Sequence, residues 1–130
     1  MAGRRLKGLT LVELLLASAL LAVVAVPILG ALARGVTLAA EIDRRTRATL
    51  LAQQRMENIL AAAAVNFGQD FTRNSEALGS GSFVTVQQTP KTVYSKTITV
   101  RVGWDADRDG VLETAEALAT LGTVIVNPGS

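Results

Sequence analysis

The chain changes its pattern of apolar and polar residues twice between its two ends. Residues 9–33 are almost entirely apolar, and a helix of that length reaches across the roughly 30 Å hydrocarbon core of a bilayer. Residues 34–65 then follow a helical period, which predicts an amphipathic helix. We expect its apolar face to consist of Leu38, Ile42, Thr49, Ala52, Met56, Ile59 and Ala63.

The C-terminal half is typical of a loop followed by strands. Residues 66–82 are rich in glycine, serine and asparagine, so we expect a loop there. The apolar period then changes to two, which is typical of strands with one buried face. The expected strands are residues 83–88, a stretch within 92–104, and residues 118–126. We place Ile98, Val100, Val102 and Trp104 on the inward face of the second strand. The pattern predicts an α+β fold in which a long N-terminal helix packs on a small antiparallel sheet.

Composition excludes several classes of chemistry. The 130 residues include no histidine and no cysteine, so histidine acid–base catalysis, thiolate zinc sites and disulfides are ruled out. The sequence also has no nucleophile–base pair and no phosphate-binding glycine loop, so we do not expect an enzyme. The net charge is only +2, and acidic residues alternate with the arginines at positions 44–47. We therefore interpret these arginines as a solvated helix face and expect no nucleic-acid partner.

The apolar segment allows more than one interpretation on general rules. A basic head at residues 4–7 precedes it and favours a cytoplasmic N-terminus for a single-pass anchor. The A-x-A pattern at residues 31–33 instead allows a secretory signal peptide cleaved after Ala33. Glu13 does not suit a signal peptide, because an ionisable group costs roughly 2.5–3.5 kcal/mol at mid-membrane. Pro27 removes one helical hydrogen bond, so we expect a kink or local melting there.

The stretch KGLTLVELLLASALL resembles the N-terminal cleavage and methylation motif of type IV pilins and pseudopilins. The resemblance implies that residues 1–8 are a leader peptide and that a prepilin peptidase cleaves between Gly8 and Leu9. Leu9 then becomes the N-methylated terminus, although the family usually has phenylalanine at this position. Glu13, the fifth residue after the cut, is implied to neutralise the terminal amine of another subunit during assembly. The run LLAQQRMENIL is similar to minor members of the family.

The resemblance also implies an architecture and a location. Residues 9–33 form a transmembrane stem, residues 34–65 continue it as an amphipathic helix, and residues 66–130 form the loop and sheet of a pilin-like fold. The subunit is then anchored in the bacterial inner membrane, with a cytoplasmic N-terminus and a periplasmic or extracellular domain. The implied partners are the peptidase, an inner-membrane assembly platform, and other subunits of a type IV pilus or type II secretion pseudopilus. The alternative is a secreted, calcium-stabilised binding module.

An acidic loop at residues 105–116 matches the calcium-loop pattern D-x-D-x-D-G-x5-E. A hard cation such as Ca²⁺ prefers clustered oxygen ligands, and Gly110 supplies the sharp turn that such a loop needs. The expected ligands are the side chains of Asp105, Asp107 and Asp109, the backbone carbonyl of Val111, and the carboxylate of Glu116, with Glu113 acting through water. Because a strand rather than a helix enters the loop, we expect a lone site that rigidifies a hairpin. The alternative is a polar turn without a metal.

Overall fold

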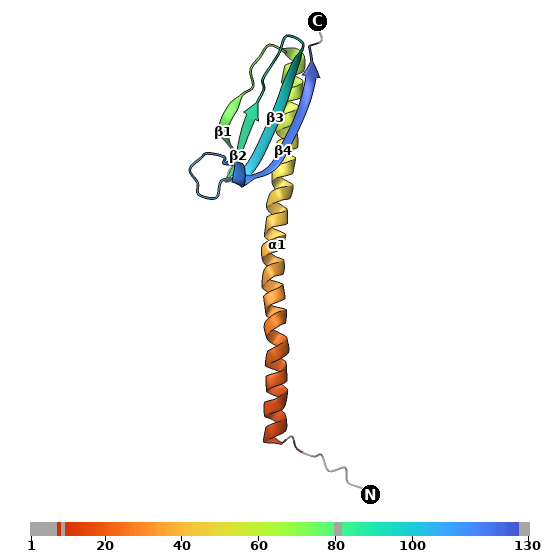
Figure 1. Cartoon of the computed structure of the whole chain (residues 1–130), viewed down its shortest axis with the longest axis vertical. Helices are drawn as coiled ribbons and strands as arrows, with labels where there is room; N and C mark the ends of the chain where they lie inside the picture. The colour runs from red at the N-terminus through yellow and green to blue at the C-terminus, as the bar shows by residue number, and fades with distance from the viewer. Residues whose placement is uncertain (1–7, 9, 80–81, 128–130) are drawn as a thin grey trace. The chain divides into compact units, whose positions relative to one another are not determined.

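A computed structural model of the chain describes Gly8 and residues 10–79 and 82–127. Within this part of the chain, one long helix is followed by a four-stranded sheet (Figure 1). The elements are α1 (Leu11–Val65), β1 (Arg73–Leu78), β2 (Phe83–Gln88), β3 (Ser95–Trp104), the short 3-10 helix η1 (Thr114–Glu116) and β4 (Ala117–Val126). The chain divides into two compact units, residues 1–40 and 41–130, and the boundary falls inside α1.

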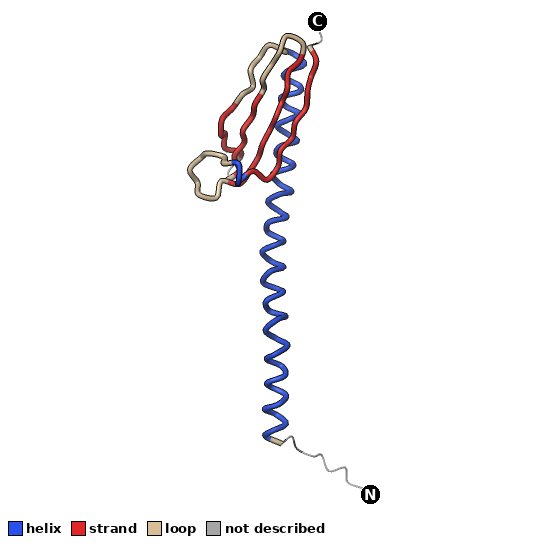
Figure 2. The backbone as a smooth tube through the Cα atoms, viewed as in Figure 1, coloured by secondary structure: helices blue, strands red, loops and turns tan. Residues whose placement is uncertain are grey.

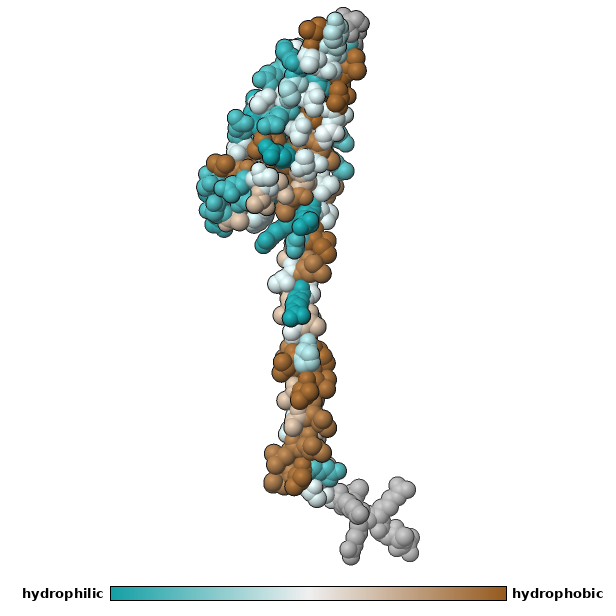
Figure 3. All heavy atoms as spheres, viewed as in Figure 1, coloured by the Kyte–Doolittle hydropathy of each residue, from teal (hydrophilic) through white to brown (hydrophobic). Residues whose placement is uncertain are grey.

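The first unit presents apolar side chains on every side of its helix. Between Leu11 and Ala40 all side chains are exposed except that of Ala25, which is half-buried. Figure 3 shows hydrophobic residues over this part of α1. The helix is long and apolar enough to cross a membrane. It continues without a break through Pro27, so the expected local melting at this residue is not seen. Proline removes one hydrogen bond, and those of the neighbouring turns hold the helix together.

The second unit begins with the part of α1 that packs on the sheet. The buried residues of the helix are Ala48, Ala52, Met56, Ile59 and Ala63. The expected apolar face is therefore confirmed from Ala52 onward. The prediction is wrong for the earlier part of this face, since Leu38, Ile42 and Thr49 are exposed. Ala48 takes the place expected for Thr49 because it lies one turn before Ala52, where a small side chain lets helix and sheet approach closely.

The sheet is antiparallel throughout, and its strands follow the chain order β1-β2-β3-β4 (Figure 1). The predicted inward face of β3 is confirmed, because Ile98, Val100 and Val102 are fully buried in the core beneath α1. Trp104 is half-buried against this core. Its ring packs edge-on against that of Phe83, with 5.1 Å between the ring centroids. The α+β fold and the three expected strands are thus present, with small shifts at their ends.

One strand lies where a loop was expected. Residues 66–82 contain β1, so the loop assignment is wrong for Arg73–Leu78 (Figure 2). The register of β1 shifts between Arg73 and Glu76, and Ser75 lies there with φ 54°. Such a bulge inserts one extra residue and reverses which side chains face the core. The segment RNSEAL therefore shows no alternation of apolar and polar residues from which a strand could be predicted.

A buried lysine extends the inward face of β3. Lys96 is fully buried, and its Nζ donates to the carbonyl oxygen of Gln69. The ammonium also lies 5.2 Å from the ring centroid of Phe67 and 5.1 Å from that of Phe71. Burial lowers the pKa of Lys96, and the nearby positive charge of Lys91 lowers it further. These contacts fasten the connection between α1 and β1 onto the sheet.

Candidate functional site

The N-terminal region exposes a glycine next to a capped helix. Gly8 is exposed and lies outside any helix or strand, while Leu9 lies outside the described residues. Thr10 caps the helix, because its Oγ1 accepts the backbone N–H of Glu13 at 3.2 Å. The carbonyl oxygen of Thr10 also accepts the N–H of Leu14 at 3.0 Å. Gly8 and Thr10 are therefore both exposed next to the first turn of α1.

Glu13 is the only charged residue of the apolar segment. It is exposed in the first turn of α1, where the helix dipole favours a negative charge. Within residues 10–79 and 82–127, the ion pairs join Arg45 to Glu41, Arg47 to Asp43, and Arg55 to Glu76. None of them involves Glu13, so its carboxylate is available to a group from another molecule.

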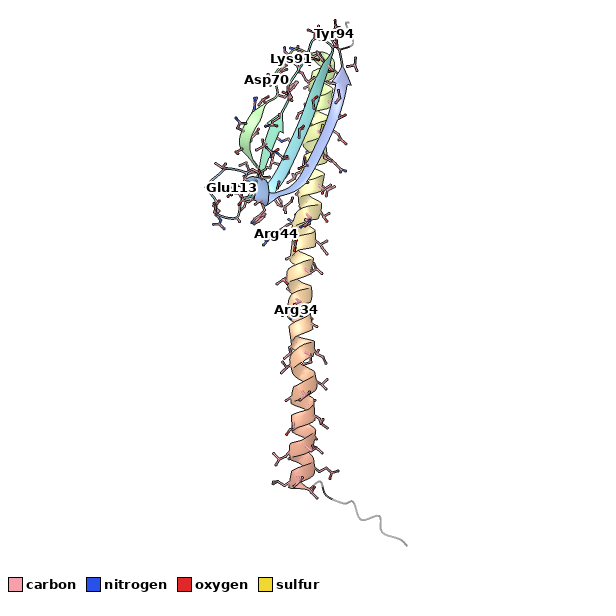
Figure 4. All side chains as sticks on the ribbon, viewed as in Figure 1. Arg34, Arg44, Asp70, Lys91, Tyr94 and Glu113 are labelled. Carbon is pink, nitrogen blue, oxygen red and sulfur yellow. The ribbon has the colours of Figure 1, made fainter. Side chains whose placement is uncertain are left out.

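The arginines at positions 44–47 all have partners within the second unit. Arg45 and Arg47 form the acid-first pairs that their spacing predicts, with N–O distances of 2.9 and 3.0 Å. The guanidinium of Arg44 lies 4.8 Å from the ring centroid of Trp104. Figure 4 shows Arg44 on the side of the unit where Glu113 and the acidic loop lie. These contacts support the interpretation of a solvated helix face.

The acidic loop brings three of its predicted ligands together. Oxygen atoms of Asp105, Asp107 and Asp109 all lie within 4.8 Å of one another. Gly110, with φ 78°, makes the sharp turn, and its N–H donates to Asp105 Oδ2 at 2.9 Å. The N–H of Val111 donates to Asp109 Oδ1 at 2.7 Å. The backbone therefore wraps around the carboxylates and holds them in one place.

Asp105 has an oxygen that no described group satisfies. The residue is only 5% exposed, and its Oδ1 is buried with no hydrogen-bond partner among the described residues. Burial raises the pKa of Asp105, but the N–H of Gly110 and further hydrogen bonds outweigh burial and hold that pKa below its usual value. A buried carboxylate oxygen without a donor is costly, so this atom calls for a cation or a proton.

The pKa of the neighbouring Asp107 is raised by the acidic groups around it. The backbone N–H of Asp109 lowers the pKa of Asp107, but the other contacts together raise it. They are a hydrogen bond to Asp105, burial, and the negative charges of Asp109 and Glu116. The bond to Asp105 exists only when one of the two carboxyls carries a proton. The opposite pKa shifts mean that, in the absence of a cation, Asp107 takes up a proton before Asp105 does.

The two remaining predicted ligands are placed differently. Glu116 is outside the group of three aspartates; its Oε1 accepts the N–H of Ala106 at 3.0 Å and its Oε2 that of Glu113 at 3.3 Å. It thus joins the beginning of the loop to its end. Val111 contributes the backbone N–H described above, and its side chain is exposed. These two hydrogen bonds of Glu116 depend on the three-dimensional path of the loop. They could not be predicted from the spacing of the acidic residues.

The buried side chain of Leu112 packs the loop against the face of the sheet opposite α1. Leu112 is buried against Val84 and Val86, which form a second core on the side of the sheet away from α1. The N–H of Leu112 donates to the Oγ of Ser75 at 3.1 Å, at the bulge of β1. The sequence analysis did not predict this second core, although an apolar residue at Leu112, two positions after Gly110, was a usable signal.

Gly103 provides the space in which the loop returns to the sheet. A Cβ atom at Gly103 would lie 2.2 Å from the carbonyl oxygen of Glu116 and 2.4 Å from Cδ1 of Leu112. We expect Gly103→Ala to lower the free energy of unfolding by about 1–3 kcal/mol, the usual cost of overpacking. Gly122→Ala on β4 is the matched control, since the nearest atom to its Cβ would be 3.9 Å away. Urea unfolding measures both; equal losses would contradict the close approach at Gly103.

Comparison with known proteins identifies the N-terminal segment. A family model described as the prokaryotic N-terminal methylation motif matches residues 3–29. The match covers the basic head, Gly8, Leu9, Glu13 and most of the apolar segment. No curated protein and no solved structure matches the chain. The evidence for a family is therefore this motif, together with the helix-and-sheet layout.

Proposed function

We propose that this chain is a type IV pilin-like protein, and more specifically a minor pilin or pseudopilin subunit of a type IV pilus or a type II secretion pseudopilus. The observation that carries the proposal is the methylation motif at residues 3–29. The run at residues 50–60 supports a minor subunit, because it is similar to minor members of the family. The motif points to a structural subunit, so we assign the chain no catalytic reaction.

We assign the cleavage to the bond between Gly8 and Leu9. Gly8 is exposed and precedes the helix cap at Thr10, which supports access by a membrane peptidase. A residue without a side chain also lets the backbone enter a narrow cleft in an extended form. Cleavage removes three of the thirteen basic residues and leaves ten against eleven acidic residues. The mature subunit is then slightly acidic, which supports a role without nucleic acid.

The apolar first unit supports an anchor in the inner membrane, where residues 9–33 form the stem. The basic head favours retention of the N-terminus in the cytoplasm. This topology places the second unit, with the sheet and the acidic loop, in the periplasm before the assembly platform extracts the subunit. In a bilayer the apolar side chains of such stems pack against one another without a hydrophobic driving force. A specific polar contact then decides which stems associate.

Glu13 supplies that contact in our proposal. Cleavage leaves a methylated, positively charged amine at Leu9, at the edge of the bilayer. A buried charge without a partner is strongly destabilising, so the amine of an incoming subunit needs a carboxylate. Glu13 is exposed, lies one turn from the terminus and has no ion pair among the described residues. These features suit it to neutralise the amine of a neighbouring subunit during docking.

The mature N-terminus tests the proposal directly. We expect intact-mass spectrometry of the membrane-extracted chain to show a protein that begins at Leu9 and carries one additional methyl group. Gly8→Ala, which adds only a methyl group at the cleavage position, should leave a larger fraction unprocessed. A chain that begins at Met1 would contradict processing. A chain that begins at Arg34 would instead support the secreted binding module.

We also propose that the acidic loop binds Ca²⁺ through Asp105, Asp107 and Asp109, with the carbonyl of Val111 and the carboxylate of Glu116 as further ligands. The close approach of the three aspartates and the unsatisfied Oδ1 of Asp105 support this proposal. Calcium takes six to eight oxygen ligands, and carboxylates are its usual partners. When bound, the ion contributes positive charge that stabilises the loop. A polar turn without a metal remains the competing interpretation.

A further inference from the structure

A small polar pocket lies between α1 and the first two strands, and no residue of the acidic loop lines it. Its volume is about 240 Å³. From the helix it is lined by Arg55, Asn58 and Ile59, and from the sheet side by Phe71, Arg73, Glu76 and Gln87. All of these residues belong to the second unit. We call this space the Gln87 pocket.

The floor of the pocket holds a donor without an acceptor. Gln87 is 4% exposed, and its Nε2 is buried with no hydrogen-bond partner among the described residues. Buried polar groups in folded proteins almost always have partners, so an orphan that lines a pocket points to a missing group. The cross-strand neighbours of Gln87 are Arg73 on β1, whose side chain carries donors only, and Val100 on β3, whose side chain is apolar. Neither side chain offers an acceptor to Nε2.

The charged residues around the pocket also favour a hydrogen-bond acceptor with a negative charge. Arg55 donates to Glu76 Oε1 at 2.9 Å, so one guanidinium already has a carboxylate. Arg73 donates to the carbonyl oxygen of Thr72 at 3.0 Å and has no acidic partner among residues 10–79 and 82–127. The guanidinium of Arg73 and the Nε2 of Gln87 are both donors. A carboxylate could accept from each of them with one of its two oxygens.

The bulge in β1 builds this arrangement. Residues three apart on a regular strand lie on opposite faces, yet Arg73 and Glu76 pair with Gln87 and Thr85, which lie on one face of β2. Asn74 and Ser75 lie opposite the single residue Val86, and this one extra residue brings both charged side chains to the helix side of the sheet. Bulges are common at sheet edges and next to active sites, where they redirect side chains, and this one gathers an arginine, an acid and a buried amide around one pocket.

The size of the pocket indicates what enters it. Pockets for small molecules span roughly 300–1,000 Å³, and this one is smaller. We propose that the Gln87 pocket binds a single carboxylate side chain, an Asp or Glu, of a neighbouring pilin-like subunit. This inference rests on the proposed function, which supplies such neighbours. Ile59 and Phe71 provide the apolar wall against which the methylene groups of that side chain pack.

The test separates a binding role from a structural role. In the full chain, Gln87→Leu removes the orphan donor, so the melting temperature should stay equal or rise, because nothing in the fold loses a partner. Incorporation into filaments should nevertheless fall at least fivefold relative to the membrane pool. The matched control is Gln88→Leu, the same change at the exposed neighbour, which should leave incorporation unchanged. Normal incorporation of Gln87→Leu, or a lower melting temperature, would overturn the proposal.

A second measurement tests the carboxylate chemistry and identifies its source. Sodium acetate should shift the side-chain amide NMR signals of Gln87 in the detergent-solubilised full chain in a saturable manner, and Arg73→Gln should weaken this binding at least threefold. Sodium chloride at equal ionic strength is the control; no shift, or an equal shift, overturns the carboxylate site. A shift with normal filament incorporation of Gln87→Leu assigns the pocket to a free acid and overturns the neighbour. If Gly8 is not processed in the wild-type chain, the proposed function fails, whatever acetate does.

Discussion

Glu13→Ala should be processed and inserted normally but lose at least tenfold in filament incorporation. The substitution leaves the amine of the neighbouring subunit without a countercharge. An ionisable group in hydrocarbon costs roughly 2.5–3.5 kcal/mol at mid-membrane and less near the interface, and each 1.4 kcal/mol corresponds to a factor of ten. The measurement is the ratio of filament-associated to membrane-associated chain by quantitative immunoblot, with mass spectrometry to verify the start at Leu9.

Three further variants separate the charge of Glu13 from its other contributions. Glu13→Gln keeps the size of the side chain and removes the charge, so it should fail like alanine. Glu13→Asp keeps the charge on a shorter side chain and should retain part of the incorporation. Ser18→Ala removes a hydroxyl from the same helix, where it donates only to the local carbonyl of Leu15, and should have no effect. Wild-type incorporation of Glu13→Gln would show that Glu13 serves the helix terminus and not the amine.

The fold could be predicted from the sequence wherever a local period determines it. Ile98, Val100 and Val102 alternate strictly, and all three are buried as expected. The strand β1 could not be predicted, because its bulge at Ser75 breaks the alternation that defines a strand. Lys96 was also missed on the inward face of β3. A charge is expected to be exposed, and its burial depends on Gln69 and two aromatic rings from a distant segment.

The candidate sites that lie within one short segment could be predicted from the sequence, and those that join distant segments could not. The proposed roles of Gly8, Leu9 and Glu13 come from a linear motif, because a peptidase and a neighbouring helix would each recognise a short segment. The three aspartates also follow from spacing, because a tight loop brings alternate residues together. The two hydrogen bonds that Glu116 accepts and the Gln87 pocket could not be predicted. Both depend on contacts between segments whose relative register only the folded sheet determines.

Addition of about 10 mM Ca²⁺ to the full chain in detergent should raise the melting temperature of the second unit by about 5–20 °C. Extracellular calcium loops bind with Kd of about 10⁻⁴–10⁻³ M, so this concentration is about 10–100 times Kd. Binding to the folded state alone then adds about 1.4–2.7 kcal/mol. Each kcal/mol raises the melting temperature of a domain this small by about 4–8 °C. Mg²⁺ at the same concentration should have a smaller effect, because it requires a stricter octahedral geometry.

Asp105→Asn distinguishes a calcium site from a plain acidic turn. The asparagine carbonyl can still accept the N–H of Gly110, and its NH₂ group replaces the unsatisfied Oδ1 next to Asp107. Without calcium, the variant should melt somewhat lower than the wild type, because the lowered pKa of Asp105 means that the fold stabilises its ionised form, which asparagine lacks. With calcium, its shift should disappear, because the buried ligand has lost its charge. Glu57→Gln, at an exposed helix position, should keep the full shift. A wild-type chain that melts at the same temperature with and without Ca²⁺ would leave the loop as a polar turn closed by Glu116.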